Sequence, residues 1–204
     1  PLANVVSSLD VLSATVAVDA QPEVQSLFDI ASRSTKRIQR LTSSLLDINR
    51  LEAGQPVIDP DPVSPYTIAS NAMHDLKPLA DNKEQTIQFI VPEDIAPVYA
   101  DGDMIERVLI NLLQNAIKFT PQNGEIEIGA SQVANMVQIW VRDNGPGVNP
   151  QSKDTIFRKF TRLHSEEGPK GLGLGLAYCR LAVEGHGGKI WVDNVREGGS
   201  IFTF

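Results

Sequence analysis

The chain has 204 residues, 42% of them hydrophobic and 6% aromatic, which is enough to bury one good core and a smaller second unit. Its formal net charge of −7 argues against a general nucleic-acid binder, because such proteins need a basic footprint. Cys179 is the only cysteine, which excludes an internal disulfide framework and favours a reducing compartment.

Residues 1–54 have the spacing of a helical hairpin. Asp19–Pro22 predicts its turn, and Gly54, followed by Pro56, predicts its end. Two helices with one apolar stripe each cannot enclose a core, so we expect a dimer in which two hairpins form a four-helix bundle. An intrachain bundle, or docking onto the rest of the chain, is the alternative. The seam positions alternate between intervals of three and four, as in a coiled coil: Leu2, Val5, Leu9, Leu12 and Val16, then Val24, Leu27, Ala31, Ser34, Ile38, Leu41, Leu45 and Ile48.

Residues 55–63 contain three prolines and predict a domain boundary, although an edge strand also fits this stretch. Beyond it, helices and strands occur in blocks, which favours an antiparallel-rich sheet covered on one face by helices. Ser64 and Pro65 predict the start of a helix that runs to about Ala80. The further predicted elements are strands 86–91 and 97–100, a helix 102–119, and hairpins of 125–130 with 136–142 and of 189–193 with 200–204.

The predicted helix 102–119 carries Asn111, Asn115 and Lys118 on one face, because residues three and four apart are neighbours on a helix. Two carboxamides and an ammonium offer oxygens to a hard cation such as Mg²⁺ and a positive charge to phosphate. The alternative is that these side chains form an ordinary solvated face.

Asp143 follows an apolar strand and precedes Gly145 and Gly147. A carboxylate fixed at a strand end can accept a hydrogen bond from an exocyclic amine such as that of adenine. The glycines would let the backbone approach a flat ring. An ordinary Asp-Asn-Gly turn is the alternative.

Gly171, Gly173 and Gly175 precede a predicted helix 177–184, where flexible backbone and unpaired amides can bind phosphate. The spacing matches neither the P-loop nor the dinucleotide fingerprint. A glycine-rich hinge is compatible with this role, and residues 161–170 have the composition of a mobile lid.

These stretches, in this order, resemble the catalytic and ATP-binding domain of sensor histidine kinases, within the superfamily that also contains gyrase, heat-shock chaperones and mismatch-repair ATPases. Asn111–Phe119 resembles the asparagine box and Asp143–Gly147 the first glycine box. Phe157–Phe160 resembles the phenylalanine box and Gly171–Leu176 the second glycine box. Ser44–Gly54 resembles the end of the dimerisation hairpin, so the likeness covers essentially the whole chain.

The resemblance implies an α+β fold with two domains. Residues 1–54 would be the dimerisation and phosphotransfer hairpin, incomplete at its N-terminus, which forms a four-helix bundle in the dimer. Residues 55–204 would be the catalytic ATP-binding domain, a two-layer α/β sandwich with a mixed, largely antiparallel sheet.

The resemblance also implies roles for individual residues. Asn115 would ligate Mg²⁺ with support from Asn111, Lys118 would contact phosphate, and Asp143 would bind the adenine amine of ATP. Arg162 is a candidate contact from the lid. The other residues implied in nucleotide binding are Gly145, Gly147, Phe160, Gly171, Gly173, Leu174, Gly175 and Leu176.

One position separates kinases from hydrolytic members of the superfamily, which carry a glutamate four residues before the metal-binding asparagine. Asn111 occupies this position, and a neutral amide cannot act as a general base towards water. The resemblance therefore implies transfer of the γ-phosphoryl group to a histidine and then to an aspartate of a response-regulator receiver domain. Pro1–Asn4 resembles the segment immediately after that histidine, which would lie upstream of residue 1.

His74, His164 and His186 lack the context of the phosphoacceptor, and we expect them to be structural or solvated. Ile201 occupies a position where relatives often carry threonine near the nucleotide, which weakens any claim that the last strand contacts the nucleotide. A dimerising scaffold without catalysis and a gyrase-type ATPase are the alternative functions. The intact boxes argue against the first, and Asn111 and the hairpin argue against the second.

The expected partners are a second copy of the chain and a response regulator, with no nucleic acid. No apolar run approaches the roughly 20 residues that a membrane-spanning helix needs. We therefore expect a cytoplasmic kinase core in which any membrane attachment comes from regions upstream of residue 1.

Overall fold

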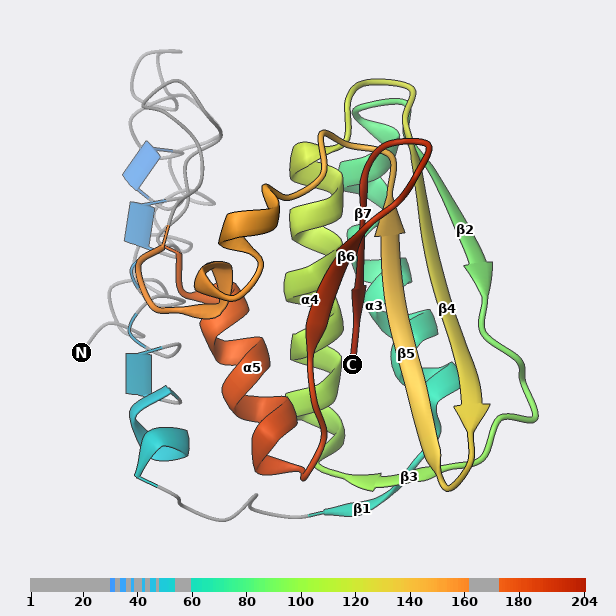
Figure 1. Ribbon diagram of the computed structural model, residues 1–204, viewed down its shortest axis with the longest axis vertical. Helices are drawn as coiled ribbons and strands as arrows, with labels where there is room; N and C mark the ends of the chain where they lie inside the picture. Colours follow the sequence, from blue (N-terminus) through green and yellow to red (C-terminus); the bar gives the residue numbers. More distant parts are fainter. Residues whose placement is uncertain are drawn as a thin grey trace, which may run out of the picture. The chain divides into compact units, whose positions relative to one another are not determined.

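The computed structural model describes residues 60–161 and 173–204, together with positions 30–31, 34–35, 38, 42, 45–46 and 48–53 (Figure 1). The chain divides into two units between Asn49 and Arg50, and each is considered by itself. In the first unit the described positions are helical, as predicted for the second helix of the hairpin. The first predicted helix, its turn at residues 19–22 and the proline-containing stretch 54–59 lie outside the described residues.

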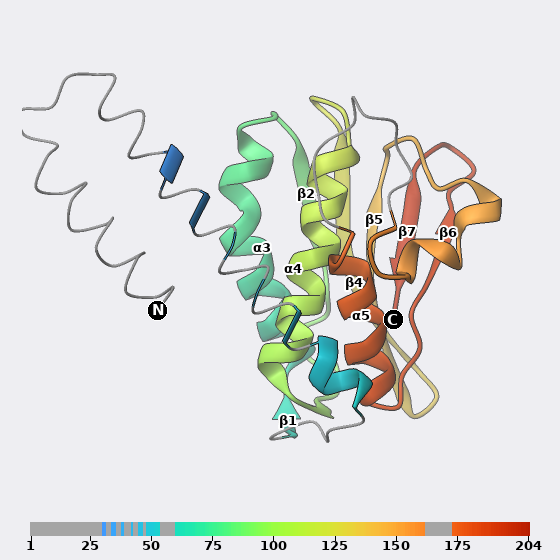
Figure 2. The same ribbon diagram turned by 90° about the vertical axis from the view of Figure 1, so that its left-hand side faces the viewer.

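The second unit is a five-stranded sheet covered on one face by helices (Figures 1 and 2). The strand order is β2-β4-β5-β7-β6; β2 and β4 are parallel, and the other neighbours are antiparallel. The predicted α+β fold with a mixed, largely antiparallel sheet is therefore confirmed. The elements are β1 Asp61–Val63, α3 Pro65–Asp81, β2 Thr86–Ile90, β3 Val98–Ala100, α4 Gly102–Phe119, β4 Glu125–Val133, β5 Met136–Asp143, α5 Gly175–Gly185, β6 Trp191–Asn194 and β7 Ser200–Thr203.

Strand β1 is the edge strand that the proline-rich stretch left open as an alternative. It pairs antiparallel with β3 in a separate two-stranded sheet. Two 3-10 turns, Pro150–Ser152 and Thr155–Phe157, lie between β5 and Phe160. None of the helices within the described residues is both long and apolar enough to cross a bilayer.

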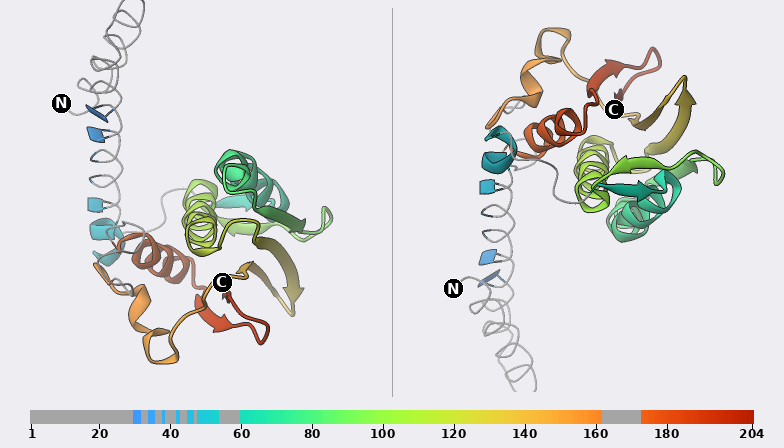
Figure 3. Two further views of the ribbon diagram at one scale, coloured as in Figure 1. Left: turned by 90° about the horizontal axis from the view of Figure 1, so that it is seen from above. Right: turned by 90° about the horizontal axis from the view of Figure 1, so that it is seen from below.

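Helix α4 is the central helix and lies between α3 and α5 (Figure 3). It begins where the Asp101 carboxylate accepts a hydrogen bond from the Met104 amide at 3.0 Å, which caps its first turn. Its apolar residues recur at helical spacing and bury one side of the helix. The members of this stripe are Ile105, Val108, Leu109, Leu112, Leu113, Ala116 and Ile117.

His186 joins the end of α5 to the start of α4. Its Nε2 accepts a hydrogen bond from the Asp101 amide at 3.0 Å, and its Nδ1 lies 2.7 Å from the Ala182 carbonyl. Because the Asp101 amide is a donor, the imidazole carries its proton on Nδ1 and donates it to Ala182. His186 is thus a structural residue, as expected from the sequence.

Cys179, on the face of α5 that packs against α4, is fully buried, with Sγ 3.7 Å from the Val108 carbonyl. Burial raises the pKa of this thiol, because a thiolate would lose its hydration. The cysteine therefore packs as a small apolar residue.

Gly129 in β4 lies opposite Trp140 in β5, and a Cβ at Gly129 would lie 2.2 Å from the indole ring. The ring is held by a 2.9 Å hydrogen bond from its Nε1 to Glu127. We expect Gly129→Ala to lower the free energy of unfolding by about 1–3 kcal/mol, because the indole must move. Ser131→Ala, on the same strand, should change it by less than about 0.5 kcal/mol. Chemical denaturation followed by tryptophan fluorescence measures both, and equal stability of the two variants would contradict this packing.

Candidate functional site

The carboxylate of Asp143 lies at the end of β5 and is only 5% exposed. Its Oδ1 accepts a hydrogen bond from the Gly145 amide at 2.9 Å, and its Oδ2 accepts one from the Ser200 hydroxyl at 2.6 Å. An ionised carboxylate has about four acceptor positions, so two donors leave room for more. Asp143 is therefore a fixed acceptor that can receive a further hydrogen bond from a ligand amine.

Glycines allow close backbone contact around Asp143. A Cβ at Gly199, which has φ +92°, would lie 1.9 Å from the Asp143 carbonyl oxygen, so the β6–β7 turn packs directly on the end of β5. A Cβ at Gly145 would lie 2.8 Å from Asp143 Oδ1 and 3.1 Å from the Phe119 carbonyl oxygen. The Asp143 carboxylate is thereby placed beside the C-terminal end of α4.

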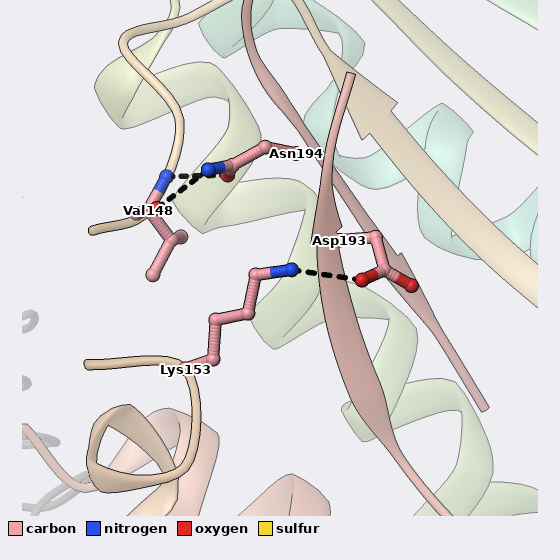
Figure 4. Close-up of polar contacts among 4 residues, drawn as sticks. All are labelled: Val148, Lys153, Asp193 and Asn194. Atoms are coloured by element: carbon pink, nitrogen blue, oxygen red, sulfur yellow. Dashed lines mark hydrogen bonds and ion pairs between the residues drawn. The ribbon is translucent and has the colours of Figure 1, made fainter. Parts of the chain in front are cut away.

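Hydrogen bonds connect the turn after Asp143 to β6 (Figure 4). The Asn194 side chain accepts a hydrogen bond from the Val148 amide at 2.8 Å and donates one to the Val148 carbonyl at 2.7 Å. Gly147 has φ +74°, and a Cβ there would lie 3.1 Å from Asn194 Oδ1. Lys153 and Asp193 form an ion pair of 2.8 Å beside this contact. The turn that contains Gly145 and Gly147 is therefore held at Val148 by Asn194. The residue before it in β6, Asp193, holds the following segment at Lys153.

The polar side of α4 carries Asn111, Asn115 and Lys118, all half-buried. The Asn111 amide oxygen lies 3.1 Å from the position that a Cβ at Gly175 would take. Gly175 is the first residue of α5, and no side chain among the described residues caps that helix start. Asn111 is thus brought against backbone amides that carry a partial positive charge.

Lys118 lies in the last turn of α4, and its ammonium is 4.8 Å from the centre of the Phe119 ring. It follows Asn115 by three residues, which places the two side chains on neighbouring positions of the helix surface. The end of α4 therefore carries both a carboxamide and a cation on the side that the apolar stripe leaves open.

Phe160 and Gly173 meet through a 2.9 Å hydrogen bond from the Phe160 amide to the Gly173 carbonyl. Both have left-handed backbone, with φ +60° and +69°. Phe160 is 61% exposed, Leu174 is buried and Leu176 is half-buried. The phenylalanine and second glycine stretches are thus adjacent in space, whereas Arg162 and Gly171 lie outside the described residues.

The last strand also borders Asp143, a contact that the sequence did not reveal. The hydroxyl near Asp143 comes from Ser200, one residue before Ile201. A hydroxyl residue directly after the glycine pair 198–199 was the signal that could have identified it. Asn194 was also missed, because its contact with Val148 spans 46 residues and has no local sequence pattern.

The donor set on α4 is compatible with Mg²⁺, which accepts amide oxygens, water and phosphate oxygens as ligands. No group of three or more His, Cys, Asp and Glu side chains suited to a metal occurs within the described ranges. A cation near α4 would therefore rest on amide oxygens, water and oxygens of the ligand, which is how Mg²⁺ commonly binds with phosphates. The arrangement suits a ligand with an amine at one end and anionic groups at the other.

Comparisons with known proteins point to the same chemistry. Residues 100–204 match the model of a family described as histidine kinase-, DNA gyrase B- and HSP90-like ATPases. The chain is 33% identical over 181 residues to the adaptive-response sensory kinase SasA of Microcystis aeruginosa, covering 88% of this chain and 47% of SasA. The chain thus spans about half the length of that relative.

Two solved structures have a similar fold. Full-length ShkA in complex with AMPPNP superimposes with a TM-score of 0.82 at 26% identity, covering 100% of this chain and 42% of that one. The histidine kinase ThkA, crystallised in complex with the response regulator TrrA, superimposes with a TM-score of 0.67 at 25% identity, covering 99% and 58%.

The neighbouring glycines 198 and 199 offer a matched test of the contact with Asp143. Both have left-handed backbone, with φ +103° and +92°, but a Cβ at Gly198 would meet nothing within 4 Å. We expect Gly198→Ala to lower the free energy of unfolding by about 1–2 kcal/mol through backbone strain alone. Gly199→Ala should cost at least about 2 kcal/mol more, because its methyl group collides with the Asp143 carbonyl. Thermal unfolding measures the difference, and equal losses would show that the turn does not press on Asp143.

Proposed function

Because the chain belongs to the histidine kinase-, DNA gyrase B- and HSP90-like ATPase family, as the ATP-binding catalytic core of a two-component histidine kinase, we propose that it holds Mg-ATP between Asp143 and the polar side of α4 and passes the γ-phosphoryl group to a histidine. The observation that carries this proposal is the buried Asp143 carboxylate, fixed by Gly145 and Ser200 beside the end of α4.

Asp143 would accept the exocyclic amine of adenine. Its position is set by two hydrogen bonds before any ligand arrives, so little reorganisation is needed on binding. Gly145 and Gly147 would let the backbone lie against the purine ring, and Phe160 would lie near the nucleotide.

Asn115, supported by Asn111, would hold the Mg²⁺ ion, and Lys118 would contact a phosphate. When bound, Mg²⁺ neutralises phosphate charge and orients the transferred group. The residues at the start of α5 would border the triphosphate: the amides of Gly173 and Gly175 would contact it, and Leu174 and Leu176 would flank them. Gly171 and Arg162 would complete the site from the lid side.

Asn111 favours phosphoryl transfer over hydrolysis. A carboxamide cannot take a proton from water, so the site would protect ATP until a histidine nitrogen attacks the γ-phosphorus and ADP leaves. The phosphoryl group would then pass to an aspartate of a response-regulator receiver domain. The structure of ThkA with TrrA provides an example of such a partnership in a relative.

A homodimer through residues 1–54 fits the apolar surface of the helix in the first unit. Ile38 and Leu45, two seam positions, are 50% and 39% exposed. A second copy would cover them in a four-helix bundle. With a net charge of −7, we propose no nucleic-acid partner, and we place this kinase core in the cytoplasm.

Asp143→Asn should weaken Mg-ATP binding about 10- to 100-fold, the effect of losing a hydrogen bond to a buried charge. The amide can still accept from Gly145, so the fold should persist. ITP lacks the exocyclic amine, and its weaker binding should change less than about threefold between wild type and variant. Asp75→Asn, at an exposed position of α3, is the matched control and should leave both nucleotides unaffected. Isothermal calorimetry measures these affinities; the absence of any Mg-dependent ATP binding by wild type would support the scaffold alternative.

With γ-labelled ATP, the chain of these 204 residues should take up no acid-labile phosphate and release little inorganic phosphate. His74 is exposed on α3, where Asp75 follows it but Pro78 comes four residues later instead of the five of a phosphoacceptor, and His186 already uses Nε2 to accept from Asp101. Acid-labile label on the chain would contradict this assignment. Steady phosphate release that Asn115→Ala abolishes would favour an ATPase of the gyrase type.

A further inference from the structure

The C-terminal end of α4 lacks donors of its own. Thr120 leaves the helix with ψ 134°, as expected for a residue before proline. Pro121 has no N–H, so it cannot bond the Ile117 carbonyl four residues earlier. The carbonyls of the last turn therefore need partners from elsewhere in the chain.

Lys83, in the turn between α3 and β2, supplies three of these partners. Its ammonium donates to the carbonyls of Ile117 at 2.7 Å, Lys118 at 3.1 Å and Thr120 at 3.1 Å. An ammonium has three N–H donors, and here each has a carbonyl acceptor. Its positive charge also lies at the negative end of the helix dipole, which stabilises the last turn.

Gln85 reinforces the same end. Its amide nitrogen lies 3.1 Å from the Ile117 carbonyl, 2.8 Å from that of Thr120 and 3.1 Å from that of Pro121, and the residue is 5% exposed. The turn that carries Lys83 is itself fixed, because the Asn123 amide donates to the Lys83 carbonyl at 3.1 Å. The end of α4 and the start of β2 thus form one hydrogen-bonded unit.

We propose that Lys83 is a positioning residue for the phosphate end of the nucleotide site. Its ammonium bonds the carbonyls of Ile117, Lys118 and Thr120, so it fixes the backbone from which the Lys118 side chain extends. Phe119, in the same turn, borders Gly145. The inference rests on the proposed function, since it takes Lys118 as a phosphate contact.

A positioning role differs from a purely structural one in what it changes. Loss of a helix cap lowers stability without regard to the ligand. Displacement of the Lys118 backbone weakens the binding of phosphates and spares the part of the ligand that Asp143 binds. The effect should also vanish when Lys118 has already been removed, because the two residues act through one contact.

The test compares Lys83→Met, Lys118→Met and the double variant by isothermal calorimetry with Mg-ATP and with adenosine. Lys83→Met should weaken Mg-ATP about 5- to 10-fold and adenosine less than about twofold. In the Lys118→Met background, the same change should cost less than about twofold. Lys77→Met is the matched control; this lysine pairs with Asp81 on the exposed surface of α3, and its loss should leave both affinities unchanged.

Amide hydrogen exchange provides a measurement that needs no nucleotide. Lys83→Met should speed exchange in residues 115–120, and Lys77→Met should not. Unchanged exchange there, equal losses for ATP and adenosine, or additive effects of the two lysines would each overturn the positioning role. Faster exchange in a chain whose wild type binds no Mg-ATP would refute the proposed function and reduce Lys83 to a cap of α4.

Discussion

Helix α4 is held between α3 and α5 by an apolar stripe, and the complete burial of Val108, Leu109, Leu112 and Leu113 leaves no freedom in how the helix is rotated. With a period of 3.6 residues, fixing these positions also fixes the side on which Asn111, Asn115 and Lys118 lie. The polar side of the candidate site is therefore a consequence of how the core packs. A polar substitution in the stripe would act on nucleotide binding as well as on stability.

Hydrogen bonds connect both ends of α4 to segments that are distant in sequence. At the start, the Asp101 backbone donates to His186 at the end of α5. At the end, Lys83 and Gln85 bind the carbonyls that Pro121 leaves without a helical donor. A helix fixed at both ends can present side chains with little loss of entropy on binding, which is the condition for a preorganised site.

The bounds of α4 were predicted correctly from the sequence, because its signals are local: a capping aspartate before Gly102, a regular apolar stripe, and a proline after Thr120.

Ser200 is an example of a contact that local sequence signals do not predict. In β7, the pairing of Val141 with Phe202 and Arg142 with Ile201 places Ser200 level with Asp143. A shift of one residue reverses which side a strand residue faces, so the hydroxyl that reaches Asp143 comes from position 200 and not from position 201. Asn194 and Lys83 act through contacts across 46 and 34 or more residues, which periodicity cannot reveal.

The charge of the chain makes local electrostatics decisive at this site. A protein with a net charge of −7 repels a nucleoside triphosphate at long range, and Asp143 adds a buried negative charge at the site itself. In the proposed site, attraction would come from short-range groups: the ammonium of Lys118, the amides at the start of α5, and a divalent cation held by neutral carboxamides. Neutral ligands suit this task, because carboxylates around the metal would add to the repulsion of the triphosphate. In this proposal Asn111 would do more than withhold a general base, since its amide would place no further negative charge beside the γ-phosphoryl group that is transferred.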